Sequence, residues 1–289
     1  MLQELLADYI CTNWTCDKRT STWPLMVDPT PSLLIILAYV IFCYVAPRIL
    51  KGRSFAIDNY VRIYNLAMVV YSVYIPYELY KNTIGYHYWP CEPLDRSTSP
   101  RSMAIAAAMW HYYFSKIIEL LDSIFFILRG KYNQLTFLHV YHHSSMIMMG
   151  WIMANFAPGG NSVFGPALNC DIHVLMYSYY FLASFGPKMQ KYLWWKKYLT
   201  RLQITQFFIN LGFLLNYIRD PTQCEWSLEL TYIKSILMIS FLVLFMNFYI
   251  QTYVFRKKKP IMNGKTTMNG KPIMDGNGNV TNGSIKKEA

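Results

Sequence analysis

Apolar runs of near membrane length recur along the chain, separated by short polar loops or loops that contain Gly or Pro. They span about 32–50, 60–80, 105–128, 137–156, 166–185, 202–218 and 231–255. Each is close to the roughly 20 residues that an α-helix needs to cross the hydrocarbon core of a bilayer. The sixth run is the weakest, because glutamines and asparagines interrupt it. The pattern predicts an all-α, polytopic membrane protein with seven transmembrane helices.

Composition divides the chain into three parts. Residues 1–31 are mostly polar, residues 32–255 contain the apolar runs, and residues 256–289 are rich in Gly, Asn and Lys. A segment of such low hydrophobicity cannot bury enough apolar surface to fold. We therefore expect a lumenal N-terminal segment, one seven-helix transmembrane domain and a disordered tail.

The net charge of +11 would suit a nucleic-acid partner, but the distribution of the charge argues against one. Alternate loops carry fourteen Lys and Arg on one side of the predicted membrane and six on the other. By the positive-inside rule the basic side is cytosolic. This orientation puts the N-terminus in the lumen and the C-terminus in the cytosol. Lys286 and Lys287 resemble a dilysine retrieval signal, so we expect the endoplasmic-reticulum membrane.

The predicted lumenal segments contain a glycosylation sequon and several cysteines. Asn13 begins the sequence Asn-Trp-Thr, which is an acceptor for N-glycosylation. An oxidising lumen permits disulfides, and a bond between Cys91 and Cys224 would join two interhelical loops. Cys11–Cys16 is the other plausible pair, and the sequence alone does not decide the connectivity.

The fourth predicted span opens with a cluster of histidines. His139, His142 and His143 are spaced i, i+3, i+4, and they are half of the six histidines in the chain. On a helix these positions share one face. Ionisable groups inside a membrane are costly and by default indicate function. The cluster is therefore the first candidate site, and Gln134 precedes it.

The third predicted span carries three charges at helical spacing. Lys116, Glu119 and Asp122 follow each other at steps of three residues, so they lie along nearly one stripe. Each charge costs roughly 2.5–3.5 kcal/mol at the centre of a membrane helix. They must pair with one another or line a polar cavity. For Glu119, an internal ion pair and a direct chemical role are equally plausible.

The fifth predicted span presents Asn169, His173 and Tyr177 at intervals of four residues, which again is one face. A lone histidine in a helix is more often a packing residue than a catalyst. His173 has polar neighbours on the same face, and the histidine cluster lies one helix away. We therefore include it in the candidate site.

A basic and aromatic loop follows the fifth span. It contains Lys196, Lys197 and Arg201, and Gln203 continues into the next span. Positive charge and aromatic residues at a membrane surface are explained by anchoring alone. The functional alternative is a docking site for an anionic, phosphate-bearing substrate.

Three kinds of chemistry suit an HxxHH box in a membrane. Imidazole is a common metal ligand, and His139, His142, His143 and His173 could hold one metal ion, as in a single-metal or di-iron-type membrane oxidoreductase. Membrane di-iron enzymes, however, need more histidines than the six of this chain, and no carboxylate pair at ligand spacing lies near the cluster. A buried neutral imidazole can instead act as a nucleophile towards an activated acyl group, and its neighbours can move protons. A purely structural role seldom needs three histidines in five positions. We favour acyl chemistry with neither metal nor cofactor.

Residues 24–256 resemble the very-long-chain fatty acid elongase family. The resemblance rests on four ordered blocks, which is far more specific than HxxHH alone, although Ser123 stands where many members have Thr. The blocks are Lys116-x-x-Glu119-x-x-Asp122, Gln134-x-x-Phe137-Leu138-His139-Val140-Tyr141-His142-His143, Asn169-x-x-x-His173-x-x-Met176-Tyr177 and Thr200-x-x-Gln203-x-x-Gln206.

The resemblance implies condensation of a long-chain acyl-CoA with malonyl-CoA, and a fold in which six of seven helices surround a long acyl tunnel closed at its lumenal end. It implies that His142 forms an acyl-imidazole, with ping-pong kinetics, and that His139, His143 and His173 assist. The polar residues of the other blocks would orient this shell, and the basic loop would bind CoA. The sequence is most similar to animal members that act on polyunsaturated and very-long-chain acyl groups. Other elongation-cycle enzymes and a second copy of the chain are possible partners.

A receptor or a transporter also fits seven spans with a lumenal N-terminus. A receptor would place its ligand site in the lumenal half, whereas the histidines and the basic loop lie in the cytosolic half. A transporter is often built from inverted repeats with broken helices, and the sequence shows none.

Overall fold

The structure is a computed structural model, and it describes residues 16–84, 93–219, 227–255, 267–268 and 271–272. Its long helices are α2 (Thr30–Ile49), α3 (Asp58–Thr83), α4 (Pro100–Ile118), α6 (Phe137–Phe156), α7 (Phe164–Ala183), α9 (Lys196–Arg219) and α10 (Leu228–Tyr249). The shorter elements are α5 (Leu121–Leu128), α8 (Pro187–Gln190), the 3₁₀ turns Tyr132–Gln134 and Gly160–Ser162, and a π-helical turn, Ile250–Val254. Apart from the two-residue strands β1 (Thr267–Met268) and β2 (Lys271–Pro272), the described chain is helical, which confirms the predicted class.

Side-chain caps fix where several helices begin. The hydroxyl of Thr136 accepts a hydrogen bond from the backbone N–H of His139 at 3.2 Å and starts α6. Ser99 and Ser227 cap α4 and α10 in the same way, and Pro100 occupies the first position of α4. A cap satisfies one of the backbone N–H groups that a helix leaves unpaired. The cap at Thr136 sets the register of the histidines that follow it.

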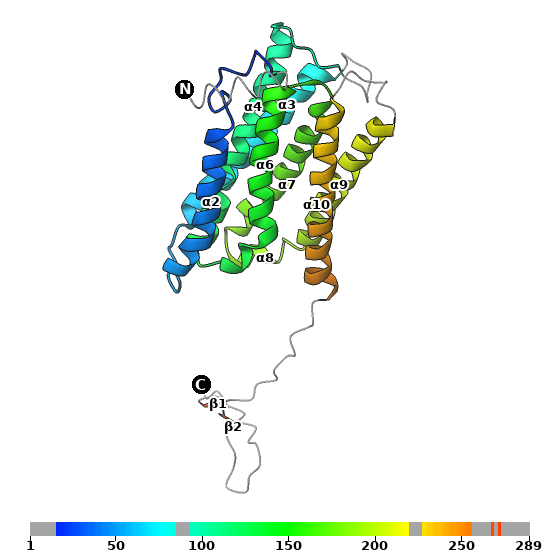
Figure 1. Ribbon diagram of the computed structural model, residues 1–289. Helices are drawn as coiled ribbons and strands as arrows, with labels where there is room; N and C mark the ends of the chain where they lie inside the picture. The colour runs from blue at the N-terminus through cyan, green and yellow to red at the C-terminus, as the bar shows by residue number, and fades with distance from the viewer. Residues whose placement is uncertain (1–15, 85–92, 220–226, 256–266, 269–270, 273–289) are drawn as a thin grey trace, which may run out of the picture.

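Six long helices form a closed ring. In order around the ring they are α3, α7, α9, α10, α6 and α4, and each packs against the next. Helix α2 lies outside, against α6 and α5 (Figure 1). Gly150 permits the close approach of α6 to α4, because a Cβ atom there would lie 3.2 Å from the Cα of Tyr113. The ring leaves an interior into which polar side chains of several helices project.

The prediction of one continuous helix over the third span, 105–128, is wrong. The span starts earlier, at Pro100, and is broken at Glu119 and Leu120 into α4 and α5. Across the break the backbone makes tight i→i−3 hydrogen bonds, from Leu120 to Ile117 at 3.2 Å and from Asp122 to Glu119 at 3.1 Å. The sequence pattern missed this break because α5 continues the apolar run. The expected basic loop is also wrong in part, since α9 begins at Lys196.

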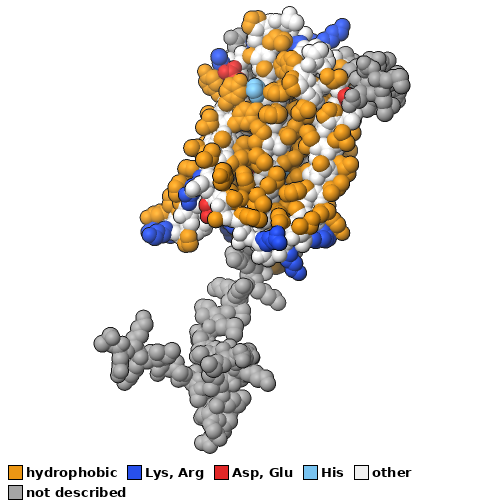
Figure 2. All heavy atoms as spheres, turned by 90° about the vertical axis from the view of Figure 1, so that its left-hand side faces the viewer, with side chains coloured by type: hydrophobic (Ala, Val, Ile, Leu, Met, Phe, Trp, Pro, Cys, Tyr) orange, Lys and Arg blue, Asp and Glu red, His pale blue; other side chains and the backbone are white. Residues whose placement is uncertain are grey.

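The outer surface of the bundle is apolar. Figure 2 shows hydrophobic side chains over the middle of the molecule, with Lys and Arg towards the two ends. Within the described residues, two helices are long and apolar enough by composition to cross a membrane, Thr30–Ile49 and Leu228–Val254. Little of either is buried inside the bundle, since only 17% and 11% of their most apolar stretches are buried. Such a surface is expected to face lipid.

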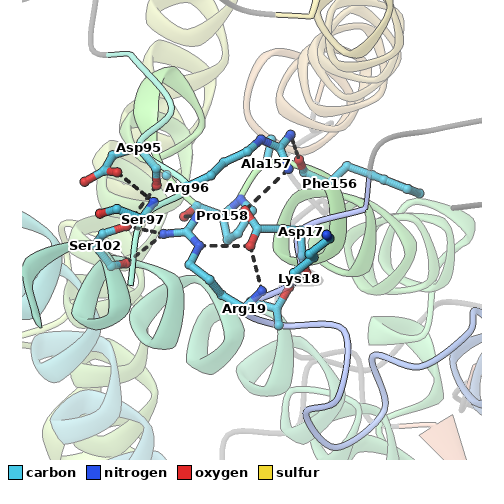
Figure 3. Close-up of polar contacts among 12 residues, drawn as sticks. Asp17, Lys18, Arg19, Asp95, Arg96, Ser97, Ser102, Phe156, Ala157 and Pro158 are labelled. Atoms are coloured by element: carbon cyan, nitrogen blue, oxygen red, sulfur yellow. Dashed lines mark hydrogen bonds and ion pairs between the residues drawn. The ribbon is translucent and has the colours of Figure 1, made fainter. Parts of the chain in front are cut away.

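The segment from Cys16 to Asp28 lies across the upper end of the bundle in Figure 1. Arg19 forms a buried two-point ion pair with Asp17, in which Nε and Nη2 lie 2.9 and 2.8 Å from the two carboxylate oxygens (Figure 3). Arg19 also donates to Ser102 at the start of α4, and Asp17 N–H donates to the carbonyl of Asn155 in α6. Two-point Arg–carboxylate pairs are strong and geometrically specific. This cluster joins the N-terminal segment to the ring.

Several expectations fall outside the described residues. Asn13, Cys91 and Cys224 are among them, as is most of the 256–289 tail. Cys16 is disulfide-bonded, whereas Cys43 and Cys170 are free. The Cys91–Cys224 pairing and the sequon at Asn13 therefore stay predictions.

Candidate active site

The first two turns of α6 bring the three clustered histidines together. The ring centroids of His139 and His143 are 4.4 Å apart, and those of His142 and His143 are 5.4 Å apart. His142 packs against two phenylalanines of α10, with its ring centroid 4.9 Å from that of Phe241 and 5.9 Å from that of Phe245. The three imidazoles therefore share one wall of the bundle interior, as their spacing predicts.

A cavity of about 400 Å³, here called the histidine cavity, is lined by His139, His142, His143 and His173. It reaches the end of the bundle that carries the start of α6 and the start of α9, because Gln134, Thr136 and Lys196 also line it. The lining further includes Asp122, Asn169, Gln203, Gln206 and Phe207. Residues from all four sequence blocks therefore meet at one cavity, whereas Lys116, Glu119 and Tyr177 do not line it.

A second space, here called the apolar cavity, lies next to the first, towards the opposite end of the bundle. Its volume is about 60 Å³, and its walls include Met146, Met149 and Met153 of α6. His142, Asn169, Gln206 and Phe207 line both cavities. His142 therefore stands where the polar space meets the apolar one.

Lys116 and Glu119 form a fully buried ion pair, each side chain being 1–2% exposed. Lys116 Nζ lies 2.7 Å from Glu119 Oε1 and donates to Asn169 Oδ1 at 2.8 Å. Nδ1 of His173 lies 3.1 Å from the same Glu119 oxygen, although its N–H does not point along a hydrogen bond. Burying both charges is costly, and close pairing with further hydrogen bonds offsets that cost. The structure thus supplies the ion pair expected for Glu119 and also sets it against a histidine.

Asn169 connects the Lys116–Glu119 ion pair to His173. Its Oδ1 accepts from both Lys116 Nζ and the hydroxyl of Tyr112, the latter at 3.2 Å. The amide nitrogen therefore faces Nε2 of His173, at 3.4 Å. Because Nδ2 can only donate, Nε2 is the acceptor, and a neutral His173 carries its proton on Nδ1.

Asp122 does not join the Lys116–Glu119 pair. Its Oδ2 accepts a hydrogen bond of 2.8 Å from the hydroxyl of Tyr177. The break between α4 and α5 turns Asp122 towards α7 and away from Lys116. The stripe of three charges predicted from the sequence is therefore divided between two partners.

Of the three residues expected to bind CoA, only one lines the histidine cavity. Lys196 is exposed and lines the histidine cavity, whereas Lys197 and Arg201 are not among its lining residues. Arg201 Nε donates to the hydroxyl of Tyr249 at 2.8 Å, and Lys197 Nζ lies 5.9 Å from the centre of the same ring. These two cations therefore hold α9 to the end of α10.

A family model described as ELO, the GNS1/SUR4 family, matches residues 24–261. The chain belongs to this family. It is 45% identical over 267 residues to very long chain fatty acid elongase 4 of Homo sapiens, covering 89% of this chain and 82% of that protein. It is 41% identical over 247 residues to elongase 2 of Mus musculus, with 85% and 82% covered. It is 39% identical over 248 residues to elongase 7 of Drosophila melanogaster, with 84% and 74% covered.

The resemblance recognised from the four blocks is thereby confirmed, and this GNS1/SUR4 family member is an enzyme of fatty acid elongation. Within the described part of the chain, no group of three or more His, Cys, Asp or Glu has the arrangement of a metal site.

Sequence reasoning did not single out Tyr112, which contacts Lys116 and Asn169, or Tyr39, which is connected to His139 only through Ser123. Tyr112 was missed although it precedes Lys116 by four residues, so helical spacing alone could have found it. Tyr39 was missed because it belongs to α2, which lies outside the ring and carries no block of the family pattern. Its hydroxyl lies 2.8 Å from Ser123 Oγ, and Ser123 Oγ lies 2.8 Å from His139 Nε2.

Proposed function

We propose that this protein is the condensing enzyme of fatty acid elongation, a very-long-chain 3-oxoacyl-CoA synthase. It joins a long-chain acyl-CoA to malonyl-CoA and yields a 3-oxoacyl-CoA two carbons longer, together with CO₂ and CoA. The observation that carries the proposal is the position of His142 between the histidine cavity, which reaches the end of the bundle that carries Lys196 (here called the basic end), and the apolar cavity beyond it. This is the position required of a group that reacts with a thioester whose acyl chain points inward.

In the first half-reaction, a nitrogen of His142 attacks the thioester carbonyl. The C–S bond breaks, CoA leaves as the thiolate and accepts a proton, and an acyl-imidazole remains. Covalent catalysis of this kind divides one difficult step into two easier ones and gives ping-pong kinetics. The neighbouring rings of His139 and His143 are close enough to exchange protons with the site directly or through one water.

In the second half-reaction, malonyl-CoA enters and loses CO₂, and the electron pair of the broken bond forms an enolate. The enolate carbon attacks the acyl carbonyl, the bond to nitrogen breaks, and the released nitrogen takes up a proton from solvent, which regenerates neutral His142. His173 stabilises the charge that develops on oxygen through the N–H on Nδ1, which makes no hydrogen bond in the resting protein, as donors preorganised in a site of low dielectric do. Lys116, Glu119 and Asn169 hold His173 in place through the contacts described above.

The acyl chain occupies the apolar cavity and the neighbouring core. Met146, Met149 and Met153 line that space, and methionine side chains adapt to irregular shapes. The relatives named above are very long chain fatty acid elongases, which supports long acyl-CoA substrates here, including polyunsaturated ones. Lys196 at the cavity mouth receives the phosphates of CoA, and Lys197 and Arg201 add to the positive field around it.

The apolar outer surface and the basic end support a membrane protein with seven transmembrane helices, whose six ring helices enclose the acyl tunnel. We place the basic end in the cytosol and the N-terminal segment in the lumen of the endoplasmic reticulum. The cluster around Asp17 and Arg19 would then close the lumenal end of the tunnel. In this orientation Asn13 is open to glycosylation, and the other enzymes of the cycle meet the cytosolic face. The reaction needs no metal or organic cofactor beyond the malonyl-CoA co-substrate.

The test is a condensation assay with purified protein in liposomes. Labelled malonyl-CoA is supplied with a panel of acyl-CoAs, and 3-oxoacyl-CoA is measured for the wild type and for His142→Ala. The proposal expects product from the wild type alone. A well-folded wild type that makes no product from any acyl-CoA would remove the proposal.

A further inference from the structure

A chain of hydroxyl groups connects the outer helix α2 to the candidate site. Tyr39 of α2 is 5% exposed, and its hydroxyl lies 2.8 Å from Oγ of Ser123 in α5. Ser123 is fully buried, and the same Oγ lies 2.8 Å from Nε2 of His139 in α6. Three helices thus meet in two consecutive hydrogen bonds that end on one of the cavity histidines.

We infer that Tyr39 and Ser123 are positioning residues for His139, which together fix its ring orientation and keep its proton on Nδ1. The inference rests on the proposed function only in so far as His139 takes part in the reaction. The placement of the proton is a property of the resting protein.

The direction of the chain follows from the acidity of its members. A phenol, with an ordinary pKa near 10, is a stronger donor than an aliphatic hydroxyl. Tyr39 therefore donates to Ser123, whose single O–H is then directed at His139. Because Ser123 donates, Nε2 of His139 accepts, and a neutral imidazole must carry its proton on the other nitrogen.

Ring orientation matters here because His139 stands between its hydroxyl partner and another histidine. Its ring centroid is 4.4 Å from that of His143 and 5.2 Å from that of Phe126, so a rotation of the ring would change both contacts. A hydrogen bond from a buried side chain commonly sets the tautomer of a functional histidine. Ser123 has this role, and Tyr39 prevents the Ser123 hydroxyl from turning away.

A matched control is present in the same helix. Ser32, also in α2, shares a hydrogen bond of 2.7 Å with the hydroxyl of Tyr113 in α4. Both residues are buried, and neither lines the histidine cavity. Tyr113→Phe therefore removes the same kind of interhelical contact of α2 as Tyr39→Phe but leaves His139 untouched.

The kinetic test compares Tyr39→Phe, Ser123→Ala, Ser123→Thr and Tyr113→Phe in liposomes. We expect kcat to fall about 3- to 10-fold for Tyr39→Phe and about 10- to 100-fold for Ser123→Ala, which is less than the roughly 100- to 10,000-fold that the acid or base itself contributes, because both residues act only through His139. KM for acyl-CoA should change less than about twofold, because positioning acts on the transition state. Ser123→Thr keeps the hydroxyl and should therefore keep kcat close to the wild-type value, unlike Ser123→Ala. Tyr113→Phe should also keep the wild-type kcat.

Thermal unfolding of each variant separates positioning from loss of packing. Equal melting temperatures for the two Tyr→Phe variants, with a loss of kcat only at Tyr39, would support the inference. An unchanged kcat for both Tyr39→Phe and Ser123→Ala, or an equal loss for Tyr113→Phe, would overturn it. A wild type without any condensing activity would instead count against the proposed function.

A spectroscopic measurement tests the tautomer of His139 without substituting Tyr39 or Ser123. Nitrogen NMR of ¹⁵N-histidine-labelled protein in bilayers, with His139 assigned by comparison with His139→Asn, reports which ring nitrogen carries the proton. We expect a protonated Nδ1 and an unprotonated Nε2 for His139. A protonated Nε2 would overturn the inference even if the Tyr39 and Ser123 variants failed to fold.

Discussion

The buried pair of Lys116 and Glu119 gives the sharpest prediction on stability. Lys116→Met keeps the apolar length of the side chain but removes an ammonium that lies 2.7 Å from Glu119 and 2.8 Å from Asn169. The side chain of Glu119, which is 2% exposed, would then remain buried without its counter-ion. Removing one partner of a buried pair destabilises a protein by about 3–5 kcal/mol. That is a large part of an unfolding free energy of roughly 5–15 kcal/mol.

The double variant Lys116→Met/Glu119→Gln separates the orphaned charge from the loss of packing. An amide at position 119 carries no charge, so most of the lost stability should return. The coupling between the two substitutions is expected to be about 2–3 kcal/mol, at the upper end for residues in contact. Condensing activity should not return, because His173 loses the acidic group that lies 3.1 Å from its Nδ1.

The assay is denaturant unfolding in detergent, followed by tryptophan fluorescence, for the wild type, both single variants and the double variant. Condensation is measured on the same preparations. A single variant as stable as the wild type, or a double variant no more stable than Lys116→Met, would refute the reasoning. Recovery of activity together with stability would show that Glu119 has only a structural role.

Three further changes test other parts of the structure. Asp17→Asn leaves the buried guanidinium of Arg19 without its carboxylate and should lower the unfolding free energy by about 3 kcal/mol, with KM for acyl-CoA unchanged; an unaltered melting curve would contradict this. Met153→Trp fills the apolar cavity and should reduce turnover of the longest acyl-CoAs about 5- to 150-fold relative to shorter ones, as overpacking of about 1–3 kcal/mol implies; an unshifted product profile would speak against an acyl chain there. Tyr177→Phe removes the hydrogen bond to Asp122 and should lower stability by about 1–3 kcal/mol and reduce the condensation rate, both of which can be read from one preparation; no change in either would make that contact irrelevant.

Much of the fold is readable from hydrophobic periodicity. The segment predicted at 137–156 coincides with α6, and the ends of α2 and α7 agree with prediction within two residues. The break at Glu119 was not readable, because the apolar run continues through α5 and the tight turn has neither Gly nor Pro. The start of α9 was placed too late, because hydropathy does not see the polar first turns of a helix.

The candidate site was predictable where it follows helical spacing. His139, His142 and His143 share a wall because of i, i+3, i+4 geometry, and His173 reaches the same cavity from α7. Contacts between elements distant in sequence were not predictable. The pairing of Asp122 with Tyr177 depends on the turn between α4 and α5, and the contact of α2 with Ser123 depends on how α2 packs outside the ring.

Two residues of the predicted basic loop show the same limit. Lys196 lies at the cavity mouth, whereas Arg201 turns towards Tyr249 in α10. Both residues are basic, and both lie in the same loop of the predicted fold. Only the helical turn between them and the placement of α10 decide which one meets the cavity.

The most direct test of the central claim is CoA release from a long-chain acyl-CoA in the absence of malonyl-CoA. Purified wild type and His142→Ala are each mixed with labelled acyl-CoA, free CoA is quantified, and the protein is digested and analysed by mass spectrometry. The account predicts about one CoA released per wild-type molecule, an acyl group on His142, and neither signal from the variant. Release of CoA only when malonyl-CoA is also present, with no acylated His142, would contradict the acyl-imidazole mechanism.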